Sequence, residues 1–180
     1  LQTAFNFKKL SGLKPRVAFL SFSTKGSAKD PSIDNTINAF NLTKKRKPNL
    51  ICDAELQFDA AFVPDVAKRK NPKGVIKGDA NVFIFPDLNS GNIAYKITER
   101  IGGAFATGPV IQGLAKPVMD LSRGCNETDI VNMTKVITNL ISTKIIQMIL
   151  RKTFHEICDE SKKNVNACSG SDVFKLMNNK

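Results

Sequence analysis

The chain has 180 residues, of which 42% are hydrophobic, so it fits one compact domain or two small ones and is not a disordered, collagen-like or coiled-coil protein. It carries 27 Lys and Arg against 16 Asp and Glu, and the net charge of +11 favours an anionic partner: a nucleotide, a phosphorylated metabolite, nucleic acid or anionic lipid. The 4 cysteines show no CxxC spacing and the only histidine is His155, so neither a Cys/His zinc site nor a disulfide framework is expected.

Strands and helices are predicted to alternate along the chain. Short apolar runs predict buried strands at 16–22, 50–52 and 81–85. Helical spacing predicts a helix from Ser32 to about Lys47, a helical segment 57–70 broken near Pro64, a helix capped by Asn89 or Ser90 and closed by Gly102 and Gly103, and a long helix from Asp129 to Met148. This alternation indicates an α/β layered fold with a mainly parallel sheet.

In such a sheet, ligands bind at the loops beyond the carboxyl ends of the strands, which here are 21–28, 86–92 and 119–126. The most apolar stretch, 130–150, contains Lys135 and Lys144, which a membrane-spanning segment would not tolerate. No cleavable signal peptide is recognisable, and we expect a cytoplasmic protein without a membrane partner.

The strongest candidate site lies just before the long helix. Ser122 offers a hydroxyl, Arg123 offers a bidentate guanidinium, Gly124 allows close backbone approach, and the start of the helix adds free N–H groups. This pattern is typical of a phosphate cradle. The same stretch also fits an ordinary helix start, with Asn126 as N-cap and Asp129 completing a capping box, and spacing alone leaves both interpretations open.

Other candidate sites have weaker signals. Four residues at the start of the helix after 81–85 could present backbone amides to a second anion, such as a pyrophosphate: Asn89, Ser90, Gly91 and Asn92. A plain strand-to-helix turn explains them equally well. The loop 23–29 has the ingredients of a phosphate loop without its full spacing. The basic runs 44–47 and 68–70 lie at helix ends without interleaved aromatic residues, so no nucleic-acid partner is expected.

Four blocks of the sequence resemble, in the same order, those of the phosphate acetyltransferase (phosphotransacetylase) family: VAFLSFSTKGSA at 17–28, DAELQFDAAFVP at 53–64, ANVFIFPDLNSGNI at 80–93 and DLSRGC at 120–125. The likeness runs from about Thr3 to Ile137. It implies an isocitrate/isopropylmalate dehydrogenase-like, three-layer αβα fold with two lobes and a cleft. It also implies the reversible transfer of an acetyl group between acetyl phosphate and coenzyme A (CoA) in acetate metabolism.

By the same resemblance, Ser122, Arg123 and Asp129 are catalytic. Asp129 would take the proton of the CoA thiol, Ser122 would hydrogen-bond the thiol or the carbonyl oxygen, and Arg123 would hold the phosphoryl group. The family implies CoA and phosphate as substrates, no metal and no other cofactor, and a homodimer. We expect direct transfer in a ternary complex and not through an acyl intermediate on Cys125.

The chain also departs from the family pattern. The family's N-terminal half is absent here, so the chain is expected to hold an incomplete fold and part of the active site. The resemblance assigns 1–116 to the second lobe, 117–150 to a return segment of the first lobe, and 151–180 to an atypical tail, in which 165–176 resembles the acetate kinase N-terminus. A phosphate butyryltransferase-like enzyme and an inactive CoA-binding fragment remain the alternatives.

Overall fold

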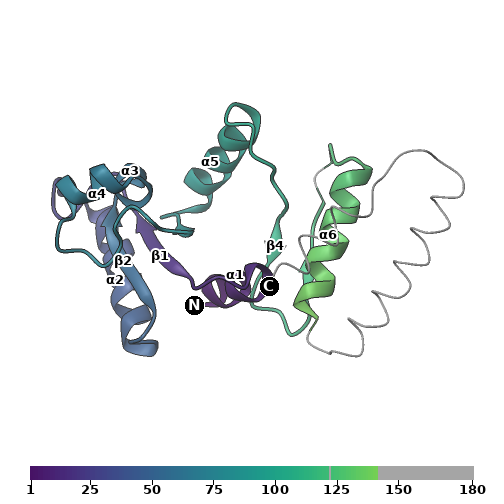
Figure 1. Ribbon diagram of the computed structural model, residues 1–180, viewed down its shortest axis with the longest axis horizontal. Coiled ribbons are helices and arrows are strands. Elements are labelled where there is room, and N and C mark those ends of the chain that lie inside the picture. Colours follow the sequence, from purple (N-terminus) through teal and green to yellow (C-terminus); the bar gives the residue numbers. More distant parts are fainter. Residues whose placement is uncertain (122, 142–180) are drawn as a thin grey trace, which may run out of the picture.

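The computed structural model describes residues 1–121 and 123–141, whose arrangement is shown in Figure 1. The helices are α1 (Gln2–Ser11), α2 (Pro31–Arg46), α3 (Phe58–Phe62), α4 (Pro64–Lys70), α5 (Leu88–Arg100) and α6 (Glu127–Leu140). The strands are β1 (Arg16–Leu20), β2 (Ile51–Leu56), β3 (Val82–Ile84), β4 (Val110–Ile111) and β5 (Val118–Met119). The first three form a parallel sheet in the order β2-β1-β3, and β4 pairs with β5 in an antiparallel ribbon. The predicted α/β fold with a mainly parallel sheet is therefore confirmed.

Both faces of the parallel sheet are covered, because successive side chains of a strand point to opposite faces. On one face, Val17 and Phe19 of β1 pack with Cys52, Ala54 and Val82 against α1 and against Phe40 of α2. On the other face, Ala18 and Leu20 pack with Leu56, with Ala61 of α3, and with Ile76 and Ala80 from the segment before β3. Helices on both faces give the three layers, αβα, that were expected.

The ends of α2, α3 and α4 follow from local chemistry. The helix α2 begins one residue earlier than predicted, because the Asp30 carboxylate accepts a hydrogen bond from the Ser32 N–H at 2.8 Å and Pro31 occupies the first helical position. Between α3 and α4, Val63 is extended (φ −108°, ψ 115°), since a residue before proline disfavours the helical conformation. The predicted break near Pro64 is confirmed.

Two predicted helix boundaries are wrong. The N-cap of α5 is Asp87 and not Asn89 or Ser90, because the Asp87 carboxylate accepts a hydrogen bond from the Ser90 N–H at 2.8 Å. The helix α6 begins at Glu127 and ends at Leu140, and Ile141 is extended, so the expected unbroken helix to Met148 stops there. Everything beyond position 141, including the predicted tail 151–180 and its resemblance to acetate kinase, lies outside the described residues.

The helix α6 stands apart from the parallel sheet and packs against α1, which lies between them in Figure 1. The Lys9 ammonium donates a hydrogen bond to the Leu140 carbonyl oxygen at 2.6 Å. The predicted ligand loop 119–126 follows β5 of the antiparallel ribbon, so it does not lie at the carboxyl edge of the parallel sheet as expected. The ribbon joins residues on both sides of the predicted 116/117 boundary, which remains a prediction. In the described part of the chain, no helix is both long and apolar enough to cross a lipid bilayer.

Candidate functional site

The start of α6 lines a small cavity of about 80 Å³, which we call the α5–α6 pocket. Its other wall comes from the second half of α5 and from residues 106–108. Of the predicted site residues, Gly124 and Asp129 line this pocket. Arg123 directly precedes Gly124 in the chain, and Ser122 lies outside the described residues. The structure therefore brings the predicted general base and the predicted close-approach glycine to one cavity.

Asp129 closes the start of α6 as well as lining the pocket. Its Oδ2 accepts a hydrogen bond from the Asn126 N–H at 2.9 Å, and the Asn126 Oδ1 accepts one from the Asp129 N–H at 3.0 Å. The capping box is therefore confirmed. Among the described residues, no donor is hydrogen-bonded to the second carboxylate oxygen, Oδ1. The geometry leaves that oxygen able to accept a hydrogen bond or a proton from a ligand in the pocket, so the two interpretations of this segment are compatible.

Arg123 is exposed in the turn that precedes α6. Within the described ranges, its guanidinium makes no hydrogen bond and no ion pair. A guanidinium presents its N–H donors in a fixed fork that matches a phosphate or carboxylate group. The chain therefore places a cation with unused donors next to Gly124, which lines the pocket.

Two cations of α5 that were missed by the sequence reasoning face the start of α6. Lys96 and Arg100 lie one helical turn apart and both line the α5–α6 pocket. Arg100 is held only weakly, since its Nε is 3.7 Å from the Glu99 Oε2 and its side chain is 81% exposed. The Lys96 ammonium lies 5.1 Å from the centre of the Tyr95 ring. The four-residue spacing of Lys96 and Arg100 is the sequence signal that places them on one face of the helix.

The other end of α5 is already occupied by a carboxylate. Hydrogen bonds from the backbone N–H and then the hydroxyl of Ser90 hold the pKa of Asp87 below its usual value, so this carboxyl is ionised at neutral pH. An anion arriving at this helix start would meet that negative charge. The residues predicted to bind a second anion there line neither the α5–α6 pocket nor the larger cavity beside β2: Asn89, Ser90, Gly91 and Asn92. Their binding role stays a prediction.

The loop after β1 uses its donors internally. The Glu55 Oε1 accepts hydrogen bonds from the Ser23 hydroxyl and from the Gly26 N–H, both at 2.7 Å. The Ser27 and Ser23 hydroxyl oxygens accept bonds from the backbone N–H groups of Thr24 and Ala28. Donors that a phosphate loop would offer to a phosphate are thus satisfied by the buried carboxylate of Glu55 and by the two serines. The residues of the loop 23–29 that resemble a phosphate loop therefore hold the loop after β1 against Glu55 of β2.

The described residues contain no group of three or more His, Cys, Asp or Glu side chains placed to hold a metal ion. Cys52 is buried and Cys125 is half-buried, and both are free thiols. Cys125 lines the α5–α6 pocket with Asp129.

Comparisons with known proteins extend this picture. The chain is 53% identical over 131 residues to the phosphate acetyltransferase of Bacillus subtilis, a match covering 73% of this chain and 41% of the relative. It is 50% identical over 136 residues to the phosphate acetyltransferase of Clostridium acetobutylicum, covering 76% of this chain and 41% of that relative. The chain therefore spans about two fifths of the length of these curated relatives.

The folds agree as well. A phosphotransacetylase from Staphylococcus aureus superimposes with a TM-score of 0.71 at 48% sequence identity, over 77% of this chain and 43% of that one. Residues 1–138 match the family described as phosphate acetyl/butaryl transferase, which is more than half of the chain. The chain belongs to the phosphate acetyl/butaryl transferase family.

Proposed function

We propose that this chain supplies one wall of the active site of a phosphate acetyltransferase, which transfers an acetyl group between acetyl phosphate and CoA. The observation that carries the proposal is the meeting of α5 and α6. There, Asp129 shares a pocket with Lys96 and Arg100, and Arg123 is the chain neighbour of Gly124, which also lines it. The identity to phosphate acetyltransferases supports the same reaction.

The proposed chemistry needs a general base for the thiol proton and a cation that binds the phosphoryl group. The Asp129 Oδ1 takes the proton of the CoA thiol, and the thiolate sulfur attacks the carbonyl carbon of acetyl phosphate. As the C–S bond forms, the bond between that carbon and the phosphate oxygen breaks, and inorganic phosphate leaves with the electron pair. Arg123 holds the phosphoryl group and stabilises the charge that develops on it. Ser122 completes the proposed set by a hydrogen bond to the thiol or to the carbonyl oxygen.

The size of the pocket limits what this chain can hold alone. A cavity of about 80 Å³ is far smaller than the ~300–1,000 Å³ typical of small-molecule sites. It accommodates a phosphoryl or thiol group, and the rest of CoA must lie along the surface outside it. Lys96 and Arg100 are placed to meet the phosphates of CoA there, and Gly124 allows close approach of the ligand to the backbone.

The exposed apolar side of α5 supports a wider assembly. The helix has no buried residue, and Leu88 and Ile101, at its start and just past its end, are both 83% exposed. Ile93, Ile97 and Ile101 follow one another at four-residue spacing and are all exposed, and an exposed apolar stripe of this kind marks a site of contact with another surface. We propose that the part of the relatives that this chain does not span covers α5 and completes the site. The proposed whole is a cytoplasmic homodimer that needs no cofactor besides its substrate CoA.

The acyl group is proposed to be acetyl, because the curated relatives are named phosphate acetyltransferases. A series with acetyl, propionyl and butyryl phosphate separates this proposal from a butyryltransferase. Binding of CoA without turnover of any of the three would identify an inactive CoA-binding fragment.

The test is thioester formation from acetyl phosphate and CoA. It is run with the chain alone and with the segment of the Bacillus subtilis relative that this chain does not span, added as a separate polypeptide. We expect Arg123→Ala to lower turnover by about 10²-fold or more, in the range found for losing one donor to a developing oxyanion. Arg69→Ala is the matched control, because Arg69 lies on α4 and lines neither described pocket. Equal turnover by the Arg123 and Arg69 variants would refute the assigned role of Arg123.

A further inference from the structure

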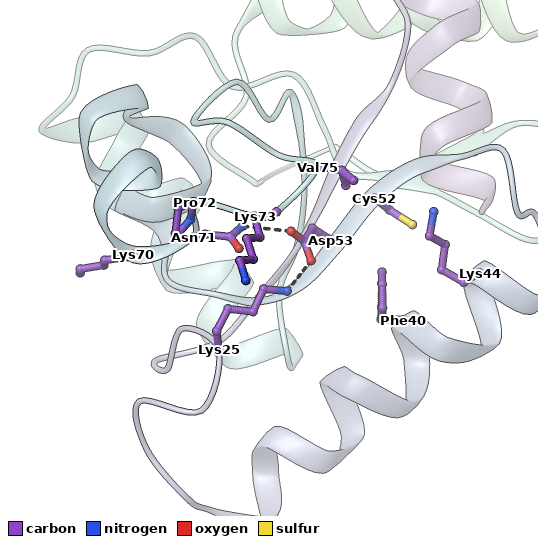
Figure 2. Close-up of a pocket in the computed structure, with 11 residues that line it drawn as sticks. Lys25, Phe40, Lys44, Cys52, Asp53, Lys70, Asn71, Pro72, Lys73 and Val75 are labelled. Atoms are coloured by element: carbon purple, nitrogen blue, oxygen red, sulfur yellow. Dashed lines mark hydrogen bonds and ion pairs between the residues drawn. The ribbon is translucent and has the colours of Figure 1, made fainter.

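A larger cavity of about 460 Å³ lies beside β2 (Figure 2), and β2 and α6 lie at opposite ends of the structure in Figure 1. We call it the lysine pocket. Its polar lining consists of Lys25, Lys44, Lys70, Lys73, Asp53 and Asn71. It shares no residue with the α5–α6 pocket. We propose that the lysine pocket is a second binding site, which takes a small phosphomonoester with an apolar or aromatic group.

The charge of the pocket favours an anion. Four lysines line it against one aspartate. Lys25 forms an ion pair with Asp53, and Lys70 pairs with Asp59 at 2.9 Å. Within the described part of the chain, Lys44 and Lys73 have no carboxylate partner. Two positive charges therefore remain in the pocket for an anionic ligand, Lys73 at the end that holds Lys25, and Lys44 on the side of Phe40 and Cys52 (Figure 2).

The single carboxylate of the pocket, Asp53, is already paired with two residues of the lining. Asp53 accepts hydrogen bonds from the Lys25 ammonium at one oxygen and from the Asn71 Nδ2 at the other, the latter at 2.9 Å. Burial alone would raise the pKa of Asp53, but these hydrogen bonds and the charge of Lys25 outweigh it and hold the pKa below its usual value. Asp53 thus stays ionised and fixes Lys25 and Asn71 at the floor of the pocket.

Unused donors face the same cavity. An ammonium group has three hydrogens. Lys44 uses two of them on the carbonyl oxygens of Pro48 and Leu50, and Lys25 uses two on Asp53 and the Ala54 carbonyl. Each keeps one hydrogen for a ligand. Lys73 donates to no other described residue, and Figure 2 shows its side chain reaching toward the same end of the pocket as that of Lys25. Phosphate oxygens are strong acceptors for such donors.

The apolar residues that line the pocket indicate which chemical group the ligand carries besides its phosphate. Phe40, Cys52 and Val75 form an apolar side of the cavity, with Phe40 half-buried and Cys52 only 1% exposed. The volume lies within the range of small-molecule sites. Inorganic phosphate would fill only a small part of it. The combination of a basic end and an apolar side fits a phosphate attached to an apolar or aromatic group.

The test is an NMR titration of the whole ¹⁵N-labelled chain with phenyl phosphate as the probe, alongside inorganic phosphate and phenol. We expect phenyl phosphate to shift the amide signals of Asn71 and Gly74 in the pocket, and to bind more tightly than either inorganic phosphate or phenol. Saturable shifts confined to Gly124, at the α5–α6 pocket, would overturn the proposal. No saturable shift at Asn71 and Gly74 up to millimolar probe would also overturn it.

Charge reversal at two nearby lysines, one that lines the pocket and one that does not, provides the matched comparison. Lys73→Glu should weaken binding of phenyl phosphate by at least about tenfold, the loss typical of one charge-assisted hydrogen bond, while leaving the thermal midpoint unchanged. Lys68→Glu, on exposed α4 outside the pocket, should weaken it far less, and an equal loss would show only unspecific attraction to a basic surface. Arg123→Ala should leave this binding intact, so the proposal stands or falls separately from the proposed acyl transfer.

Discussion

Replacing Asp53 by asparagine should destabilise the protein far more than the loss of a single surface charge. The Asp53 side chain is 8% exposed, and it lies on β2 between Lys25 and Asn71. Its Oδ1 also accepts a hydrogen bond from the Ala54 N–H at 2.9 Å. Asparagine has nearly the same size, but its amide NH₂ is a donor and must face Lys25 or Asn71, which are donors themselves. The variant therefore loses acceptor capacity without leaving a cavity.

The size of the effect follows from burial. A hydrogen bond to a charged group is worth about 1.5–3 kcal/mol, and removing one member of a fully buried ion pair costs about 3–5 kcal/mol. The Lys25 side chain is 41% exposed, so water solvates its ammonium once the carboxylate is gone and reduces the loss. We expect the free energy of unfolding to fall by about 2–3 kcal/mol at neutral pH.

The effect should depend on pH. Because the pKa of Asp53 in the fold is below its ordinary value of 3.8, its stabilisation is fully present above pH 3.8. It is lost as the pH falls through the lower pKa of the folded state. The difference between the native chain and the Asp53→Asn variant should therefore be constant near neutral pH and shrink in strong acid.

Urea unfolding of both chains, followed by circular dichroism, measures the difference, with an unchanged slope m as the sign that the unfolding reaction is the same. Asp120→Asn is the control, because Asp120 is exposed and outside the helices and strands. If Asp53→Asn came within about 0.5 kcal/mol of that control, the usual range for surface substitutions, the role given to the buried carboxylate would be refuted.

Three further predictions use thermal or urea unfolding. Glu55→Ala should cost about 1–3 kcal/mol because it leaves the buried Ser23 hydroxyl and the Gly26 N–H without their acceptor, whereas Glu55→Gln keeps a carbonyl oxygen there and should cost under about half as much. Equal losses for the two variants would contradict the account. Leu56→Ala, at a fully buried position, should lower the free energy of unfolding by about 2–5 kcal/mol. Ile97→Ser, on the exposed side of α5, should lower it by less than about 0.5 kcal/mol, and a large loss for Ile97 would show that α5 is packed. Gly78→Ala should destabilise the protein strongly, because the added Cβ would lie 2.3 Å from the Pro64 nitrogen. Gly26→Ala has a similar φ but nothing within 4 Å of the added Cβ, so it should lower the free energy of unfolding by only about 1 kcal/mol. The reverse order would contradict the geometry.

The buried strands and the break at Pro64 could be predicted because their causes are local. An apolar run between polar loops indicates a strand, and a proline restricts the residue before it. The capping box of Asn126 and Asp129 was readable for the same reason, since both partners lie within four residues. The Asp87 cap was missed although it is also local, because Asp87 was assigned to the loop after the strand.

The length of β2 could not be predicted from local sequence. It was expected to stop at Cys52, since aspartate and glutamate are depleted in strands, yet it continues to Leu56. Asp53 is tolerated there because Lys25, 28 residues away, neutralises it, and Glu55 because Ser23, 32 residues away, donates to it. Such partners become visible only when the chain is folded. The spacing of Lys96 and Arg100 places them on one face of α5, but only the folded chain shows that they share a pocket with the start of α6.

The proposed role of Asp129 is tested most directly by Asp129→Asn, assayed together with the segment of the Bacillus subtilis relative that this chain does not span. Asparagine keeps an oxygen for the capping box but cannot accept the thiol proton. We predict that acetyl-CoA formation from acetyl phosphate falls by about 10²-fold or more, as for the loss of a general base, while the dissociation constant of CoA measured by calorimetry stays the same. Undiminished turnover by the variant would contradict the assignment of Asp129 as the base.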